Sequence, residues 1–137
     1  MSKNKNNKPV WSSRISKDTS YIFQKVGNSL RIDRRLFKED LRGSIAHVEM
    51  LYKQKIISLS IKNKIVWGLN RIFNEINRKK FFFNEKNEDI HMSIEKRLFE
   101  IIGEDAGYIH TARSRNDQVL TDFKLWLRDS TKEIIKE

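Results

Sequence analysis

A near-absence of helix-breaking residues constrains the fold of this chain more than any other feature. Proline occurs once in 137 residues, at Pro9, and glycine occurs five times. Because both residues interrupt helices and favour turns, a chain with so few of them is expected to form long helices. Its length is that of one ordinary domain. Cysteine is absent, which excludes a disulfide scaffold, a thiolate metal site and a cysteine nucleophile.

Four segments carry apolar residues every three or four positions, the spacing that places them on one face of a helix. No segment alternates as a strand does, so the predicted fold class is all-α. Within the first segment, Gly43 costs about 1 kcal/mol relative to alanine and indicates a close helix contact or a nearby ligand. The predicted helices span residues 33–55, 58–77, 89–102 and 116–137, with a connection over 78–87 and a loop over 104–113. Ser58 or Ser60 can cap the second helix, and Gly103 is a natural C-terminal stop for the third.

The formal net charge of +10 is concentrated at the start of the chain. Residues 1–38 hold ten lysines and arginines against two acids, a net charge of +8, whereas residues 39–137 are nearly balanced at +2. A basic arm suits a phosphate backbone, but it equally suits a solvated tail. Residues 1–17 are polar and rich in lysine and asparagine, so we expect a basic, flexible leader there. We find neither a secretory signal nor a membrane-spanning run of about 18 apolar residues.

The segment that is richest in chemically active side chains is HTARSRNDQ, residues 110–118. It lies between two apolar-patterned helices, which places Ser114–Asp117 at a helix N-terminus. Unpaired N–H groups and the positive end of the helix dipole meet two arginines there, a combination that suits a carboxylate or phosphate. The alternative is a solvated loop in which Asn116 or Asp117 caps the helix.

Two further segments combine capping residues with titratable groups. In EDIHM, residues 88–92, Asp89 is expected to cap the third helix, and His91 could face a polar cavity. His91 and Glu95 are four residues apart, a weak metal-binding pattern that lacks a third ligand. In NSLRID, residues 28–33, a serine and an aspartate lie at the entry to the first helix. None of the three histidines forms a nucleophilic triad with a serine by spacing.

The order of five motifs resembles the N-terminal part of the argininosuccinate lyases, members of the fumarase/aspartase superfamily. The resemblance begins near residue 10 and continues to residue 137, and HTARSRNDQ together with EDIHM is its most specific part. The family usually has Trp-Gly-Gly-Arg where this chain has Trp-Ser-Ser-Arg. The motifs are WSSR (11–14), NSLRID (28–33), LRGSIAH (41–47), EDIHMSIEKRL (88–98) and HTARSRNDQ (110–118).

The resemblance implies a reaction, a cofactor requirement and an assembly. These enzymes split argininosuccinate into arginine and fumarate by elimination, the last step of arginine biosynthesis, and need no cofactor. The family is cytoplasmic and homotetrameric, and three subunits contribute to each active site. It further implies an N-terminal helical domain over residues 18–112 and the start of a long central-bundle helix over 113–137.

By the family's pattern, residues from three of these motifs contribute to substrate handling. Those implied to bind substrate are Ser29, Arg113, Ser114, Arg115 and Asn116. Those implied to line or support the site are Asp33, Asp89, His91 and Thr111.

The resemblance assigns no catalytic acid or base to this chain, because the family carries those groups in two later regions. We therefore expect an N-terminal fragment that is inactive alone and that exposes the apolar face of its fourth helix. The resemblance also implies a small-molecule substrate, no metal, and neither nucleic acid nor membrane as a partner. The alternatives are a non-catalytic lyase subunit or binding module, and a basic nucleic-acid-binding protein.

Overall fold

The computed structural model describes residues 27–137, and every regular element in that range is a helix. The all-α prediction is therefore confirmed for the described residues, while the leader predicted over 1–17 lies outside them. No helix in this range is both long and apolar enough to span a bilayer. The elements are α2 (Leu30–Asp33), η2 (Arg34–Leu36), α3 (Phe37–Lys53), α4 (Leu59–Asn77), α5 (Ile90–Ile102), η3 (Gly103–His110) and α6 (Arg115–Lys136).

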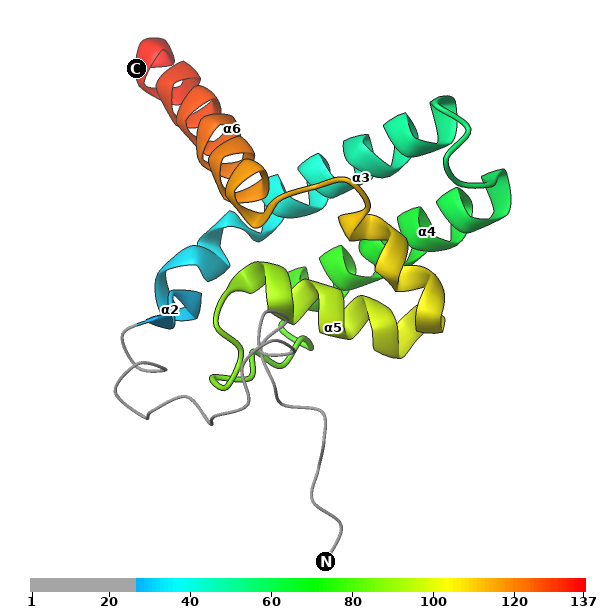
Figure 1. Cartoon of the computed structure of the whole chain (residues 1–137). Helices are drawn as coiled ribbons and strands as arrows, with labels where there is room; N and C mark the ends of the chain where they lie inside the picture. The colour runs from blue at the N-terminus through cyan, green and yellow to red at the C-terminus, as the bar shows by residue number, and fades with distance from the viewer. Residues whose placement is uncertain (1–26) are drawn as a thin grey trace, which may run out of the picture.

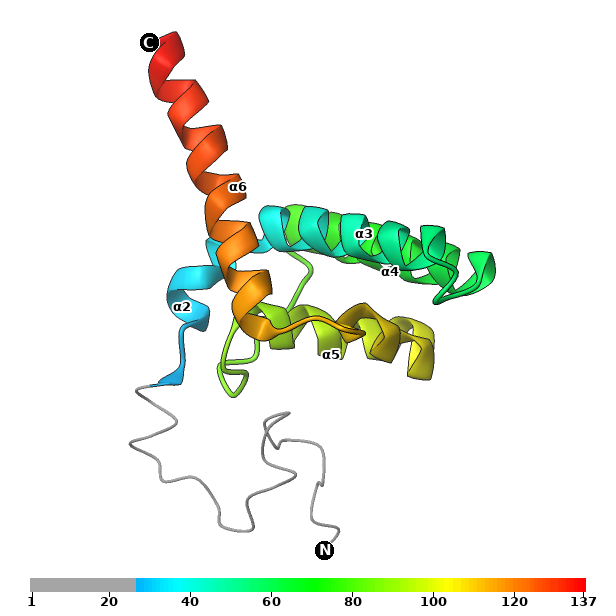
Figure 2. The same cartoon turned by 45° about the horizontal axis from the view of Figure 1, so that its top comes forward.

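The helices form a small body from which one long helix projects. α3 and α4 are antiparallel neighbours, α5 packs against α4, and η3 folds back onto α5 (Figure 1). α6 contacts α3 as far along as the ion pair of Asp129 with Arg42, while its C-terminal end extends away from the body (Figure 2). This arrangement brings the N-terminal ends of α5 and α6 close to the short α2.

Apolar side chains from α3, α4 and α5 build the core at the positions that helical spacing predicts. The stripes of the first three predicted helices are buried or half-buried. The predicted stripe of the fourth helix instead faces outwards, because polar side chains of α6 contact α3. Fully buried members of the core include Val48, Leu51, Ile65, Leu69, Ile72, Ile90 and Leu98.

The ends of the helices follow local side-chain chemistry. Ser58 caps α4 by accepting a hydrogen bond from the Ile61 N–H, and Asp89 caps α5 by accepting one from the Met92 N–H. Gly103 ends α5 with a φ of 74°, a left-handed conformation that glycine adopts without a steric penalty. These three predictions are confirmed.

Three predicted boundaries are wrong. The first long helix begins at Phe37 instead of residue 33, because α2 and η2 turn the chain before it. The loop predicted over 104–113 contains the 3₁₀ helix η3, whose Ala106 and Ile109 are buried at the three-residue spacing of such a helix. The N-cap of α6 is Ser114, whose hydroxyl and the Asp117 carboxylate complete a capping box.

Two helical glycines face other helices at different distances. A Cβ on Gly68 would lie 2.5 Å from Leu98 Cδ1, whereas a Cβ on Gly43 would approach no atom of its neighbours closer than 3.4 Å. We expect Gly68→Ala to lower the free energy of unfolding by about 1–3 kcal/mol through overpacking. Gly43→Ala, at ordinary contact distance, should raise it by up to about 1 kcal/mol through helix propensity. Urea denaturation of the two variants measures both changes, and equal effects would contradict this distinction.

Candidate functional site

The predicted site residues of α2 and α5 form one hydrogen-bonded corner. The Ser29 hydroxyl donates to Asp33 Oδ2 at 2.5 Å, and the other Asp33 oxygen accepts the Ile90 N–H at 3.1 Å. The Ser29 and Leu30 N–H groups both donate to the Glu88 carbonyl. Burial raises the pKa of Asp33, and the nearby Asp89 carboxylate raises it further. Ser29 is exposed, so this corner presents a hydroxyl to solvent.

Arg115, in the first turn of α6, connects that helix to α5. Its guanidinium donates to both oxygens of Glu95, at 2.9 and 3.1 Å, and its Nε lies 3.5 Å from Asp89 Oδ2. It also donates to Gln118 Oε1 at 2.8 Å. Burial lowers the pKa of Arg115, but its bonds to Glu95 and the charges of Glu95 and Asp89 outweigh this and raise it. Its charge is therefore already shared with two carboxylates.

A buried polar cluster joins α3, α5 and α6, and we call Asp40, His91, Gln118 and Asp122 the buried cluster. His91 Nδ1 lies 2.9 Å from Asp40 Oδ1 and 3.5 Å from Asp122 Oδ2. The Gln118 amide donates to the same Asp40 oxygen at 2.5 Å. All four side chains are at most 2% exposed. The second Asp40 oxygen and both Asp122 oxygens find no hydrogen-bond donor among the described residues.

Two groups of the buried cluster, Asp122 and His91, have raised pKa values. Burial raises the pKa of Asp122 to about 7, and the adjacent Asp40 charge contributes in the same direction. Burial lowers the pKa of His91, but its hydrogen bond to Asp40 and the charges of Asp40 and Asp89 outweigh burial and raise it. His91 Nδ1 therefore lies between two buried carboxyl groups, 2.9 Å from Asp40 and 3.5 Å from Asp122.

Asp40, His91 and Asp122 are also the described residues that could hold a metal ion, because their ligand atoms lie within 4.8 Å of one another. A metal would require the lone pair of His91 Nδ1. That nitrogen instead lies at hydrogen-bond distance from an oxygen that also accepts from Gln118. The geometry therefore favours a hydrogen-bonded proton on His91 Nδ1 over a metal ion at this position. Glu95, four residues after His91, does not join this group, because it pairs with Arg115.

The start of α6 presents groups suited to an anion. Arg113 donates to the Ser44 hydroxyl at 3.0 Å and has no carboxylate within 4 Å among the described residues. Ser114 caps the helix, and Asn116 is exposed directly after it. A partly exposed arginine beside a helix N-terminus stabilises a negative ligand. Of the two arginines, Arg113 is the one whose charge is available to such a ligand.

Thr111 lies behind this helix start, where its carbonyl accepts a hydrogen bond from His47 Nε2 at 2.9 Å. Burial lowers the pKa of His47, and the charge of Arg113 acts in the same direction. A neutral His47 therefore holds the segment before α6 against α3. His110 Nδ1 lies 3.6 Å from Glu95 Oε1 of α5.

Sequence reasoning missed four residues that organise this region. Asp40 and Ser44 lie two turns and one turn before the buried Val48, and Gln118 and Asp122 are four residues apart. Polar residues that continue an apolar helical face were the available signal. The missed residues are Asp40, Ser44, Gln118 and Asp122.

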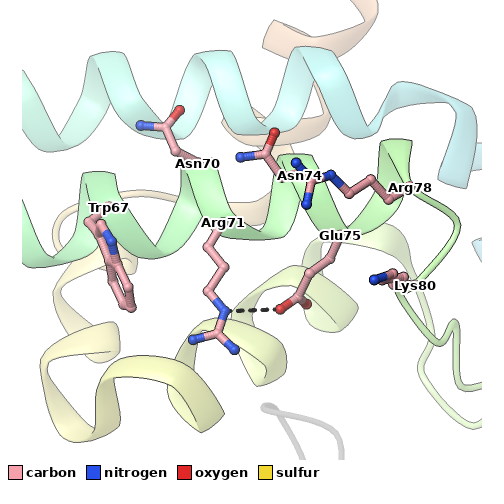
Figure 3. A pocket seen from close by; sticks show the side chains of 7 residues that line it. All are labelled: Trp67, Asn70, Arg71, Asn74, Glu75, Arg78 and Lys80. Atoms are coloured by element: carbon pink, nitrogen blue, oxygen red, sulfur yellow. Dashed lines mark hydrogen bonds and ion pairs between the residues drawn. The ribbon is translucent and has the colours of Figure 1, made fainter.

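A surface cavity of about 370 Å³ lies elsewhere, along the outer side of α4 (Figure 3). All of its lining side chains except Glu75 are exposed, and Arg71 pairs with Glu75 at 3.1 Å. No residue of the predicted site contributes to it. The lining residues are Trp67, Asn70, Arg71, Asn74, Glu75, Arg78 and Lys80.

Comparison with known proteins gives consistent matches. The chain is 68% identical over 136 residues to an argininosuccinate lyase of Pelagibacter ubique, covering 99% of this chain and 29% of that enzyme. It is 46% identical to one of a Chelativorans species over 94% of this chain and 27% of the relative. It is 49% identical to one of Campylobacter jejuni over 93% of this chain and 28% of the relative.

The chain therefore spans less than a third of the length of these curated relatives. The resemblance read from the five motifs is confirmed. A profile of the family described as "Lyase" matches residues 13–137, nearly the whole chain. On this match, the chain belongs to the lyase family, whose fold is the all-α one observed here.

Proposed function

We propose that this chain is the N-terminal portion of an argininosuccinate lyase, which splits argininosuccinate into arginine and fumarate in arginine biosynthesis. The observation that carries the proposal is the 68% identity over 99% of the chain to an enzyme of that name. The anion-suited start of α6 and the hydroxyl-bearing corner at Ser29 support it independently.

The proposed reaction requires positive charge and hydrogen-bond donors at fixed positions. A base removes a proton from the carbon next to a carboxylate, the C–N bond breaks, and an acid protonates the departing guanidinium nitrogen. The intermediate carries two negative charges on that carboxylate group, which preorganised donors stabilise. We propose that Arg113, Ser114 and Asn116 supply such donors, with Arg115 and Ser29 also contacting the substrate. We assign no proton-transfer step to any residue of this chain.

We propose that Asp33, Asp89, His91 and Thr111 support the binding residues. Each holds an element end in place: Asp33 holds the start of α5, and Asp89 caps α5 while approaching Arg115. His91 ties α5 to α3 through Asp40, and the Thr111 carbonyl accepts from His47 on α3.

We also propose a homotetrameric, cytoplasmic enzyme without a cofactor, in which α6 begins a second, central domain over 113–137. The projection of α6 beyond the body formed by the described residues 27–112 supports this division (Figure 2). Its outward face is apolar, which suits burial against other helices. The exposed side chains of that face are Val119, Leu120, Phe123, Trp126, Leu127, Ile134 and Ile135.

A chimera tests the proposed function directly. In it, this chain replaces the 136-residue stretch that it matches in the Pelagibacter ubique enzyme. We expect the chimera to release fumarate from argininosuccinate, measured by ultraviolet absorbance, and the 137-residue chain alone to release none. A folded chimera that releases no fumarate, assayed beside the active parent enzyme, would contradict the proposal.

Asn116→Ala in the active chimera tests the substrate contact at the start of α6. Losing a hydrogen bond to a charged group should lower kcat/KM by roughly 10–100-fold. Asn63→Ala, an exposed asparagine on α4, is the matched control and should leave kcat/KM unchanged. An unchanged kcat/KM for Asn116→Ala would remove this residue from the proposed site.

A further inference from the structure

Asp40 occupies a connecting position that no motif of the site predicts. One of its oxygens accepts both from His91 on α5 and from Gln118 on α6, at 2.9 and 2.5 Å. Gln118 in turn accepts from Arg115, so a single α3 carboxylate is connected to two residues of the proposed site. Asp40 itself is fully buried and contacts no solvent.

The orphaned oxygens of the buried cluster have a simple explanation. The second Asp40 oxygen and both Asp122 oxygens lack donors among the described residues. Because buried carboxylate oxygens are costly to leave unpaired, one proton carried by Asp122 and directed at the second Asp40 oxygen would satisfy two of these three oxygens. Asp40 then accepts hydrogen bonds from His91, Gln118 and Asp122 together.

We propose that Asp40 is a positioning residue, whose buried carboxylate holds the His91 ring and, through Gln118, the orientation of Arg115. This inference rests on the proposed function for its effect on catalysis, but not for its effect on His91. Asp40 does not itself contact substrate; it contacts His91 and Gln118, and Gln118 in turn contacts Arg115. Its loss should displace those residues without removing any of them.

The first measurement follows His91 itself in the 137-residue chain. The groups that face His91 are Asp40 from α3, Asp33 from α2, Asp89 from the start of α5, and Arg115 and Asp122 from α6. Nitrogen-15 NMR of the imidazole across pH should show His91 titrating above the usual histidine range in the parent chain. In Asp40→Asn it should titrate below that range, because burial then acts without its main opposing charge.

The second measurement uses the active chimera. Asp40→Asn should lower kcat/KM about 100-fold, since small displacements of positioned groups carry costs of this order. Asp129→Asn is the matched control, because Asp129 also connects α6 to α3, through an exposed ion pair with Arg42 at 3.3 Å. That variant should keep kcat/KM within twofold of the parent.

Circular dichroism checks folding, and Gln118→Met provides a second variant if Asp40→Asn does not fold. Removing one donor to Asp40 should lower kcat/KM about tenfold. An unchanged His91 titration, or a folded Asp40→Asn chimera with full kcat/KM, would overturn the inference. An inactive parent chimera would instead count against the proposed function, and the His91 titration in the isolated chain would still decide the role of Asp40.

Discussion

Replacing Leu98 with alanine should lower the free energy of unfolding by about 2–5 kcal/mol. Leu98 is fully buried in α5, where it packs over the backbone of Gly68 on α4. Because Gly68 has no side chain to fill the space, removing the leucine would leave a cavity between the two helices. Most of the lost contact energy would therefore not be recovered. Urea denaturation of the 137-residue chain, followed by circular dichroism, measures the change.

Phe99→Ala is the control for that experiment. The neighbouring Phe99 side chain is larger than leucine, but it is 56% exposed. Its truncation should change the unfolding free energy by no more than about 0.5 kcal/mol. If Phe99→Ala cost as much as Leu98→Ala, the packing of α5 against α4 would have been assigned to the wrong face.

Stability should fall as pH rises from about 4 to about 7, through Asp122. Burial first, and then the charge of Asp40, raises the folded-state pKa of this carboxyl from 3.8 to about 7. Between these values the folded chain binds a proton that the unfolded chain has lost, so each step up in pH favours unfolding. The expected slope reaches about 1.4 kcal/mol per pH unit. The raised pKa of His91 acts in the same direction above 6.5.

Asp122→Asn tests this slope, because asparagine carries no titrating proton in a side chain of similar shape. Its unfolding free energy, measured at pH 5, 6 and 7, should decline less steeply than that of the parent chain. Asp129→Asn alters an exposed carboxylate on the same helix and should keep the parental slope. Identical slopes for the parent and Asp122→Asn would show that Asp122 is ionised throughout this range.

The features that sequence reasoning predicted correctly are those determined within a few residues. The stripes of α3, α4 and α5 and the caps at Ser58 and Asp89 depend on local spacing and on one side chain each. The pattern predicts the start of α6 within two residues, and the solvated-loop alternative gives Asn116 or Asp117 as its cap. Ser114 takes that position because its hydroxyl and the Asp117 carboxylate act together. Helix ends are decided by such small differences.

The buried cluster could not be predicted, because it is created by tertiary contact. Asp40 and Asp122 lie 82 residues apart in the sequence and come together only where α6 crosses α3. Each, taken alone, is typical of a solvated helix position. The resemblance likewise predicts that Arg115 binds substrate. Its two bonds to Glu95 depend on the packing of α6 beside α5, which the sequence alone does not reveal. The family resemblance identified positions in the chain, and the fold identified their partners.

The contact between α6 and α3 also sets the geometry of everything beyond it. With 22 residues, α6 is about 33 Å long at 1.5 Å per residue, so a tilt of 5° at its base moves its tip by about 3 Å. The buried cluster lies near that base, within the first two turns. The buried cluster, which holds the proposed substrate-binding residues, would thus also set the direction of α6. A substitution in the cluster would therefore misplace any helix packed near the far end of α6.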